Sequence, residues 1–525
     1  MKILLETCPS VLLETGSERV RLRPENGRSV YKDVEIALSP ASDGLDVELT
    51  ASGTPVKRVY LTWEFAAPEN AKVYSDAWER GYGDLEWRGV VPERAMPWYT
   101  LINHAGGTYG FGVKTGANAM CWWKLDGYSI TLCLDVRNGA QGVVLSGRTL
   151  KAAKAVFMSA GPEKSAFEAA RDFCRTMCGE PRLPRGYVFG SNNWYYAYGN
   201  ISHAQVLKDA ELLKELAGDI PVRPYLVIDD GWQVSRTPSY NGGPWHSGNA
   251  DFPDMEKLAS EIKARGLRPG LWYRPLVTVE QVPEEWRLRR VKDERFSVLD
   301  PSHPQALAKI EDMTRTLVRW GYELLKHDFT TYDVFGRWGP YMGASLTDEG
   351  WGFYDKSRTT AEIILDMYRV IRRGAGDDTV IIGCNTLSHL SAGLFELQRT
   401  GDDTSGRQWE RTRKMGVNTL AFRMPQHGAF YLCDADCAGV TEYIDWKLNR
   451  EWLNLLAESG TPLFVSIDPD TATLEQKQDV AQAFRTACGV KEPSEPLSWL
   501  STTCPDLWRT EKGVQRFHFP SMPDE

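Results

Sequence analysis

From Tyr187 onward the sequence alternates short apolar segments with longer amphipathic ones, and this alternation limits the possible folds more than any other feature. We predict eight strands, at residues 187–194, 224–229, 268–273, 322–328, 379–385, 394–400, 429–434 and 462–467. Eight strand–helix units in about 280 residues are typical of a (β/α)8, or TIM, barrel. An open doubly wound sheet is the alternative, but no Gly-x-Gly-x-x-Gly follows a predicted strand.

The segments between these strands have the periodicity of helices. Ser202 followed three residues later by Gln205 predicts the start of one helix, because a serine at this position accepts a bond from the first turn. A later segment repeats apolar side chains at helical spacing, at Leu307, Ile310, Met313 and Leu317.

The first part of the chain has a different rhythm. Up to about residue 161, short alternating segments are separated by turns such as Glu25-Asn26-Gly27, which predicts an antiparallel β-sandwich. A helix over 162–177 then leads to the barrel. We therefore expect a multidomain chain, with a sandwich and linker helix at 1–178, a catalytic barrel at 179–472 and a short C-terminal helix and hairpin tail at 473–525.

Composition excludes several classes of protein. The net charge of −9 argues against nucleic acid or an anionic membrane as a partner. The start, Met1–Cys8, has the wrong composition for a signal peptide, and ten cysteines in 525 residues are no disulfide framework, so a cytoplasmic protein is expected. The histidines and cysteines show no metal-ligand spacing, so we expect no metal and no cofactor. A homo-oligomer stays open.

Polar residues gather where the predicted strands end, which is where barrels of this kind carry their active sites. These segments are 192–194, 229–232, 272–274, 326–328, 384–385, 399–403 and 434–436. They supply carboxylates, a lysine and tryptophans without a phosphate motif. Glycoside cleavage needs such a set, because one carboxylate attacks or stabilises the anomeric carbon and a second protonates the leaving oxygen.

Four motifs in this region resemble those of clan D glycoside hydrolases, families 27 and 36, the α-galactosidases or melibiases. They are LVIDDGW at 226–232, DFPDMEKLASEIKARGLRPGLWYRP at 251–275, Lys-His-Asp at 326–328 and RTGDDT at 399–404. The motifs come in the family's order between about residues 187 and 468. The predicted sandwich before these motifs is similar to the arrangement in family 36.

The resemblance implies a role for each matched residue. Asp328 would be the nucleophile, and Lys326 would bind the sugar 3- and 4-hydroxyls and favour the ionised form of Asp328. Asp229 and Asp230 would bind the 4- and 6-hydroxyls, which selects the galacto configuration. The predicted substrate-binding residues are Trp194, Asp229, Asp230, Trp232, Trp272, Lys326, Cys384, Arg399 and Asp403.

Two adjacent aspartates compete for the acid/base role. Alignment on the family 36 pattern T-S-D-N-T selects Asp402, which we prefer, whereas counting from Arg399 as in family 27 selects Asp403. The family's glycine-rich segment after the fifth strand, which surveys the sugar 2-substituent, is replaced here by Cys384-Asn385-Thr386-Leu387. The sequence therefore leaves open whether the bound sugar is galactose, N-acetylgalactosamine or galactosamine. Two interpretations are open for the aromatic segment 78–87 of the sandwich: a loop that reaches the site and an ordinary surface loop, of which we prefer the second.

The expected function is a retaining exo-α-galactosidase acting on oligosaccharides or glycoconjugates. An α-N-acetylgalactosaminidase of the same fold is one alternative, and a non-catalytic sugar-binding relative is another. Transglycosylation is not distinguished from hydrolysis.

Overall fold

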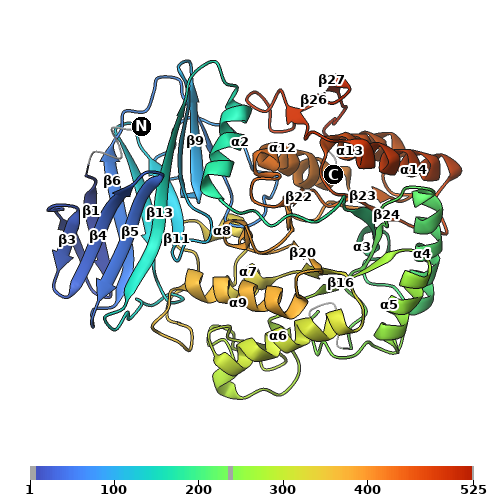
Figure 1. The fold of residues 1–525 in the computed structure, drawn as a ribbon, viewed down its shortest axis with the longest axis horizontal. Helices are drawn as coiled ribbons and strands as arrows, with labels where there is room; N and C mark the ends of the chain where they lie inside the picture. The colour runs from blue at the N-terminus through green and yellow to red at the C-terminus, as the bar shows by residue number, and fades with distance from the viewer. Residues whose placement is uncertain (1–7, 235–240, 523–525) are drawn as a thin grey trace.

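The computed structural model describes residues 8–234 and 241–522 of the chain. The segment 1–7, on which the expectation about a signal peptide rests, lies outside the described residues. A β-sandwich and a (β/α)8 barrel lie side by side, with the sandwich in blue and cyan and the barrel from green to red (Figure 1). Both predicted architectures are confirmed.

The sandwich consists of two antiparallel sheets. One has the order β2 (Arg19–Leu22), β1 (Ser10–Thr15), β6 (Val56–Glu64), β12 (Ser129–Asp135), β11 (Met120–Leu125) and β8 (Met96–Pro97). The other has the order β3 (Arg28–Tyr31), β4 (Val34–Ala41), β5 (Gly44–Ala51), β13 (Thr149–Ala160), β10 (Gly107–Val113), β9 (Tyr99–His104) and β7 (Lys72–Ser75). Aromatic rings pack between the sheets, since the ring centroids of Trp63 on β6 and Phe157 on β13 lie 5.6 Å apart.

Helix α2 (Ala166–Met177) connects the sandwich to the barrel. Its N-terminus has a complete capping box, in which Ser165 and Glu168 each bond the other's backbone N–H. The helix packs closely on β10, because a Cβ on Gly110 would lie 2.9 Å from the ring of Phe173. The glycine therefore permits the close approach of helix and sheet.

The barrel strands are all parallel and follow the order of the chain. They are β14 (Phe189–Asn192), β15 (Tyr225–Ile228), β16 (Arg268–Tyr273), β19 (Leu324–His327), β20 (Val380–Gly383), β21 (Leu397–Arg399), β22 (Leu432–Asp434), β23 (Cys437–Val440) and β24 (Leu463–Ile467). β22 pairs with β21, whereas β23 pairs with β24. Only Ala435 and Asp436 separate β22 from β23, so these two strands share the seventh position and close the ring around to β14.

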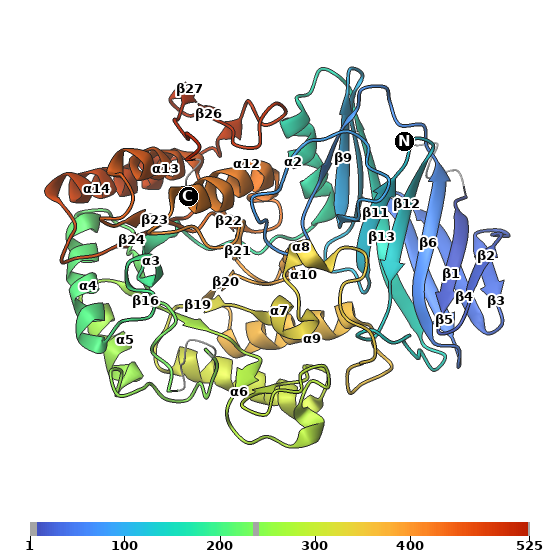
Figure 2. The same ribbon diagram turned by 180° about the vertical axis from the view of Figure 1, so that it is seen from behind.

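Helices surround the strands, and Figure 2 shows them from behind. They include α4 (His203–Ala217), α5 (Met255–Ala264), α6 (Pro304–Arg319), α9 (Thr360–Ala375), α13 (Trp446–Ser459) and α14 (Leu474–Gly489). The hydroxyl of Ser202 accepts a bond from the N–H of Gln205 at 3.2 Å and begins α4, as predicted. On α6, Ile310, Met313 and Leu317 are buried, which agrees with the predicted periodicity.

Short elements cover the carboxyl ends of the strands. They are α3 (Trp194–Ala197), β17 (Val277–Thr278), η1 (Glu284–Trp286), β18 (Ser297–Val298), α7 (Thr330–Phe335), α8 (Gly339–Met342), α10 (Ser388–Ser391), α11 (Trp409–Arg411), η2 (Thr412–Asn418), α12 (Thr419–Arg423) and η3 (Met424–Gln426). Of the predicted site residues, Trp194 lies on one of them, α3.

The C-terminal part contains the expected helix and hairpin. Helix α14 packs between α13 and α4 and so belongs to the ring around the barrel. A small sheet of β25 (Glu495–Pro496), β26 (Leu507–Thr510) and β27 (Gly513–Arg516) follows. Among the described residues, no helix combines the length and apolar character that a membrane span requires.

Candidate active site

A buried ion pair joins the ends of three strands. Lys326, near the end of β19, donates from Nζ to Oδ2 of Asp229 at 2.6 Å, and Asn192 at the end of β14 donates to the same oxygen at 2.6 Å. Burial alone would lower the pKa of Lys326, but the carboxylate of Asp229 outweighs it and the net pKa is raised. Lys326 therefore stays an ammonium ion inside the barrel mouth.

Asp230 lies beside this pair and has its own partners. Its Oδ1 accepts a bond from Nε2 of Gln233 at 2.5 Å, and its Oδ2 accepts one from Nδ2 of Asn241 at 3.4 Å. The N–H of Asp230 donates to Oδ1 of Asp229 at 2.9 Å, which fixes the two carboxyl groups relative to each other. Adjacent carboxylates are thus oriented by separate donors.

Asp328 follows β19 directly and is 8% exposed. Its Oδ2 accepts a bond from the indole N–H of Trp272 at 3.0 Å, and its Oδ1 accepts one from the backbone N–H of Phe329 at 2.7 Å. Phe329 has a φ of +63°, an uncommon conformation for a bulky residue that is seen where a site imposes it. Both oxygens of Asp328 are therefore held in one orientation.

Positive charges keep Asp328 ionised. Burial alone would raise its pKa, but Arg80 and Lys326, together with the bond from Trp272, hold the pKa below its ordinary value of 3.8. An anionic, oriented carboxylate at the end of a barrel strand has the chemistry of a nucleophile.

The three predicted tryptophans occupy different positions. Trp272 contacts Asp328, whereas Trp232 is fully buried and donates its indole N–H to the carbonyl of Trp272 at 2.9 Å. Trp232 therefore bonds the backbone of Trp272, and both side chains are buried. Trp194, the first residue of α3, is half-buried and packs against Tyr198 at 5.5 Å between ring centroids.

The loop after β21 carries the two candidate acids. Asp402 is held at both oxygens, by Arg80 at 2.7 Å on Oδ1 and by Arg411 at 3.1 Å on Oδ2. The Asp403 carboxyl accepts one bond within the described part of the chain, from Nη1 of Arg399 at 3.3 Å. The side chain of Asp403 is 36% exposed and that of Asp402 is 21% exposed.

Electrostatics link Asp403 to the other side of the site. Burial alone would raise the pKa of Asp403. The positive charges of Arg399, then Arg80 and Lys326, outweigh burial and lower the pKa to about 2. The charge of Asp403 also acts on Asp328, whose pKa it raises. Asp403 therefore lies within electrostatic reach of the candidate nucleophile.

Arg399 anchors this loop to the seventh strand position. Its Nη1 pairs with Asp436 at 2.9 Å and its Nε approaches Asp434 at 3.5 Å. Asp436 also accepts bonds from the hydroxyl of Tyr195 and from the N–H of Thr404 at 2.8 Å. Asp434 and Asp436 are therefore buried residues that hold Arg399, and Asp436 also holds the backbone of the loop that follows Arg399.

The sandwich contributes to the site, so the preferred interpretation of segment 78–87 as a surface loop is wrong and the alternative, a loop that reaches the site, is correct. Gly81 donates its N–H to the carbonyl of Thr400 at 2.8 Å, and Asp402 donates its N–H to the carbonyl of Gly81 at 2.9 Å. Arg80 additionally donates to Sγ of Cys384 at 3.5 Å. The expected surface loop is instead packed against the carboxyl ends of β20 and β21.

Sequence reasoning missed Arg80 and Arg411. A signal for the first was present in Gly81, where a Cβ would lie 2.9 Å from the side chain of Thr419. Glycines within an aromatic segment indicate close packing of the backbone. Nothing in the local sequence names the partner of this loop, because the contacting residues lie more than 300 positions away.

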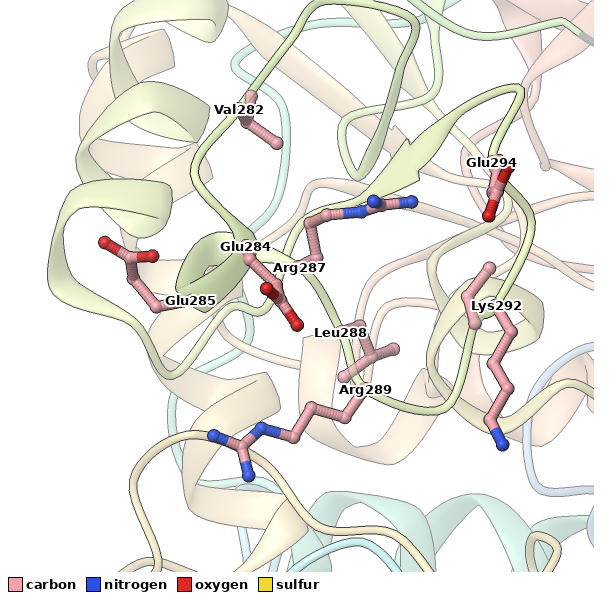
Figure 3. Close-up of a pocket in the computed structure, with 9 residues that line it drawn as sticks. Val282, Glu284, Glu285, Arg287, Leu288, Arg289, Lys292 and Glu294 are labelled. Carbon is pink, nitrogen blue, oxygen red and sulfur yellow. The ribbon is translucent and has the colours of Figure 1, made fainter.

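A separate hollow of about 730 Å³ lies inside the loop between β17 and β18. It is lined by Val282, Glu284, Glu285, Arg287, Leu288, Arg289, Val291, Lys292 and Glu294, with Arg287 directed across the interior (Figure 3). Arg287 donates to the carbonyl of Asp293 at 2.9 Å, and Arg290 donates to the carbonyl of Asp333 at 2.8 Å on α7. The loop is therefore closed by its own cation and braces α7, which follows Asp328.

This combination of sandwich and barrel is a fold that solved α-galactosidases share. No family model matches the chain. An α-galactosidase from Thermus thermophilus, solved with p-nitrophenyl α-D-galactopyranoside, is 18% identical, with a TM-score of 0.60 over 97% of this chain and 98% of that one.

Two further structures extend the likeness to longer proteins. The family 36 α-galactosidase AgaA from Geobacillus stearothermophilus is 14% identical, with a TM-score of 0.58 over 92% of this chain and 74% of its own. The galactosidase domain of the α-galactosidase–sucrose kinase AgaSK is 14% identical, with a TM-score of 0.61 over 99% and 78%. At these identities the comparisons establish the fold.

Proposed function

We propose that this protein is a retaining exo-α-galactosidase that hydrolyses terminal α-linked galactose. The observation that carries the proposal is the buried, anionic Asp328, which is oriented by Trp272 in a fold shared with α-galactosidases. A site that only binds sugar has no need of a carboxylate held in this state beside a second pair of acids.

The chemistry follows from the positions of the groups. Asp328 attacks the anomeric carbon as the glycosidic bond breaks, and the acid gives its proton to the leaving oxygen. The acid/base residue, now ionised, then deprotonates a water molecule. This water attacks the glycosyl ester of Asp328 and releases galactose with its original configuration. Asp229, Asp230 and Lys326 bind the hydroxyls of the sugar.

Asp402 is our proposed acid/base, from its place in the motif. Asp403 is the second candidate, and two observations favour it. Asp402 has both oxygens on arginines, whereas Asp403 has one bonded oxygen and acts electrostatically on Asp328. The pKa of Asp403, which is about 2, counts against it, because Asp403 is then ionised in the free enzyme and a general acid must carry a proton. Leaving-group dependence separates them, because only the loss of the true acid slows poor leaving groups far more than activated ones.

An α-N-acetylgalactosaminidase remains the alternative within the same fold, because Cys384 and its neighbours replace the family's glycine-rich segment. The test is a panel of aryl α-glycosides that differ at the 2- and 4-positions. We expect α-galactoside to exceed α-glucoside by at least about tenfold in kcat/KM, a difference of about 1.4 kcal/mol. Equal rates would refute the galacto assignment.

The nucleophile is tested directly by covalent trapping. A fluorinated or cyclitol-type inactivator followed by peptide mass mapping should label Asp328, and NMR should show a product of retained configuration. Asp328→Ala should lose several orders of magnitude in turnover while remaining folded. A label elsewhere, or an inverted product, would remove Asp328 from this role.

A further inference from the structure

Arg80 reaches from the sandwich into the barrel mouth. It lies in the connection between β7 and β8 and is 5% exposed. Its Nη2 contacts Asp402 at 2.7 Å, its Nη1 donates to Cys384, and its guanidinium lies over the ring of Trp338 at 5.4 Å. A cation from one domain is thus enclosed by strand ends of the other.

Titratable groups on several elements surround Arg80. The carboxyl groups are those of Asp328 after β19, Asp402 and Asp403 after β21, and Glu79 on its own loop. Cys384 after β20 and Tyr82 are neutral, because burial raises the pKa of each. Among the cations that act on Asp328, Arg80 lowers the pKa most, ahead of Lys326. Arg80 therefore faces both the candidate nucleophile and a candidate acid.

Domain docking does not account for this arrangement. Arg423 on α12 already forms a buried ion pair with Asp76 of the sandwich, through Nε at 3.0 Å and Nη2 at 2.9 Å. The backbone bonds of Gly81 hold the same loop on the barrel. A buried ion pair adds little net stability even when it is well formed, so the pairing of Arg80 with Asp402 points to a role beyond adhesion.

We propose that Arg80 is a positioning residue of the active site, which orients the Asp402 carboxyl and presents its positive charge to Asp328. This inference rests on the proposed function. It makes the sandwich a contributor to catalysis, because the charge that supports the barrel's nucleophile is carried by a sandwich loop.

The test compares Arg80→Gln, which keeps hydrogen-bond donors but removes the charge, with Arg80→Lys, which keeps the charge. The acidic limb of kcat/KM should move to higher pH by about one unit in Arg80→Gln, because Asp328 loses a stabilising cation. Arg80→Lys should restore most of that shift. The fall in kcat should exceed any change in KM, since Arg80 acts through carboxylates that do the chemistry.

Arg423→Gln is the control, because it breaks another ion pair between the domains, which is more deeply buried and lies away from these carboxylates. It should lower the thermal midpoint without moving the acidic limb. An Arg80→Gln enzyme with an unmoved limb, or a limb moved equally by Arg423→Gln, would overturn the proposal. If Arg80→Gln does not fold, Arg80→Lys is the deciding variant. An acidic limb and a kcat equal to those of wild type would support the proposal. A loss of turnover as large as that of an inactive enzyme would refute it.

A second measurement separates this inference from the proposed function. NMR titration of protein labelled with carboxyl-¹³C aspartate, with the Asp328 signal assigned from Asp328→Asn, reports ionisation without substrate. If wild type hydrolyses no α-galactoside, the proposed function fails, and the titration still tests Arg80. An Asp328 signal that titrates identically in wild type and Arg80→Gln would refute the electrostatic role.

Discussion

Glu79, the neighbour of Arg80, should make the stability of the protein depend on pH. Its side chain is 0% exposed. Oε1 accepts bonds from the hydroxyl of Tyr82 and from the N–H of Gly339 at 2.8 Å, whereas Oε2 has no hydrogen-bond partner among the described residues. Burial outweighs the nearby cation and raises the pKa of Glu79 from 4.5 to about 7.

The direction of the effect follows from proton binding. Between pH 4.5 and about 7 the folded protein holds this proton and the unfolded chain releases it, so stability falls as pH rises through this range. At 1.36 kcal/mol per pH unit, the full difference is about 3 kcal/mol, and it persists above pH 7. Below pH 4.5 both states are protonated, and the loss is absent.

Glu79→Gln should remove this dependence. The amide keeps an acceptor for Tyr82 and Gly339 but cannot ionise, so any constant cost of the substitution is the same at both pH values. Urea unfolding of wild type and variant at pH 5 and pH 8 should show a difference in stability that changes in favour of the variant by up to about 3 kcal/mol. Glu69→Gln, which removes an exposed carboxylate of the same domain, controls for net charge. A Glu79→Gln difference that is the same at both pH values would refute the reasoning.

The remaining predictions concern the barrel mouth. Asp229→Ala should lower kcat/KM on α-galactosides by an amount equal to about 2–4 kcal/mol of transition-state binding, because a charged hydrogen bond is lost. Urea unfolding should also show the variant to be less stable by about 3 kcal/mol, since Lys326 is left buried and unpaired. Asp230→Ala should show a comparable kinetic loss, and an unchanged kcat/KM for both variants would contradict the binding roles. Asp402→Ala and Asp403→Ala should be compared on aryl galactosides of rising leaving-group pKa, and the variant with the steeper dependence identifies the acid.

Much of the barrel could be predicted because its signals are local. Strand periodicity and the residues just beyond each strand placed Asp229, Lys326 and Asp328 at one mouth, and the structure brings them together. The seventh strand was predicted only up to Asp434. Asp436, with a φ of +70°, divides that strand position in two, and a non-glycine residue gives no warning of such a conformation.

What sequence could not give was the direction in which a side chain points and its distant partners. Trp232 and Trp272 are both buried near strand ends, yet only Trp272 bonds Asp328, and Trp232 bonds the carbonyl of Trp272 instead. Periodicity along a barrel strand does not separate these two roles. The pairing of Arg80 with Asp402 depends on how two domains dock. No pattern within either segment contains that information.

Two carboxylates of the mouth, Asp229 and Asp402, share one arrangement, in which each is paired with a cation from another element. Asp229 is paired with Lys326 across the strands, and Asp402 is paired with Arg80 across the domains. A buried carboxylate without its cation is costly, so these pairs must form together as the chain packs. An isolated barrel would retain Lys326 for Asp229 but would lose both Arg80 and the backbone bonds of Gly81 around Asp402. The boundary between sandwich and barrel therefore divides the chain into two folds but not into two functional units, because the mouth is complete only where the domains meet.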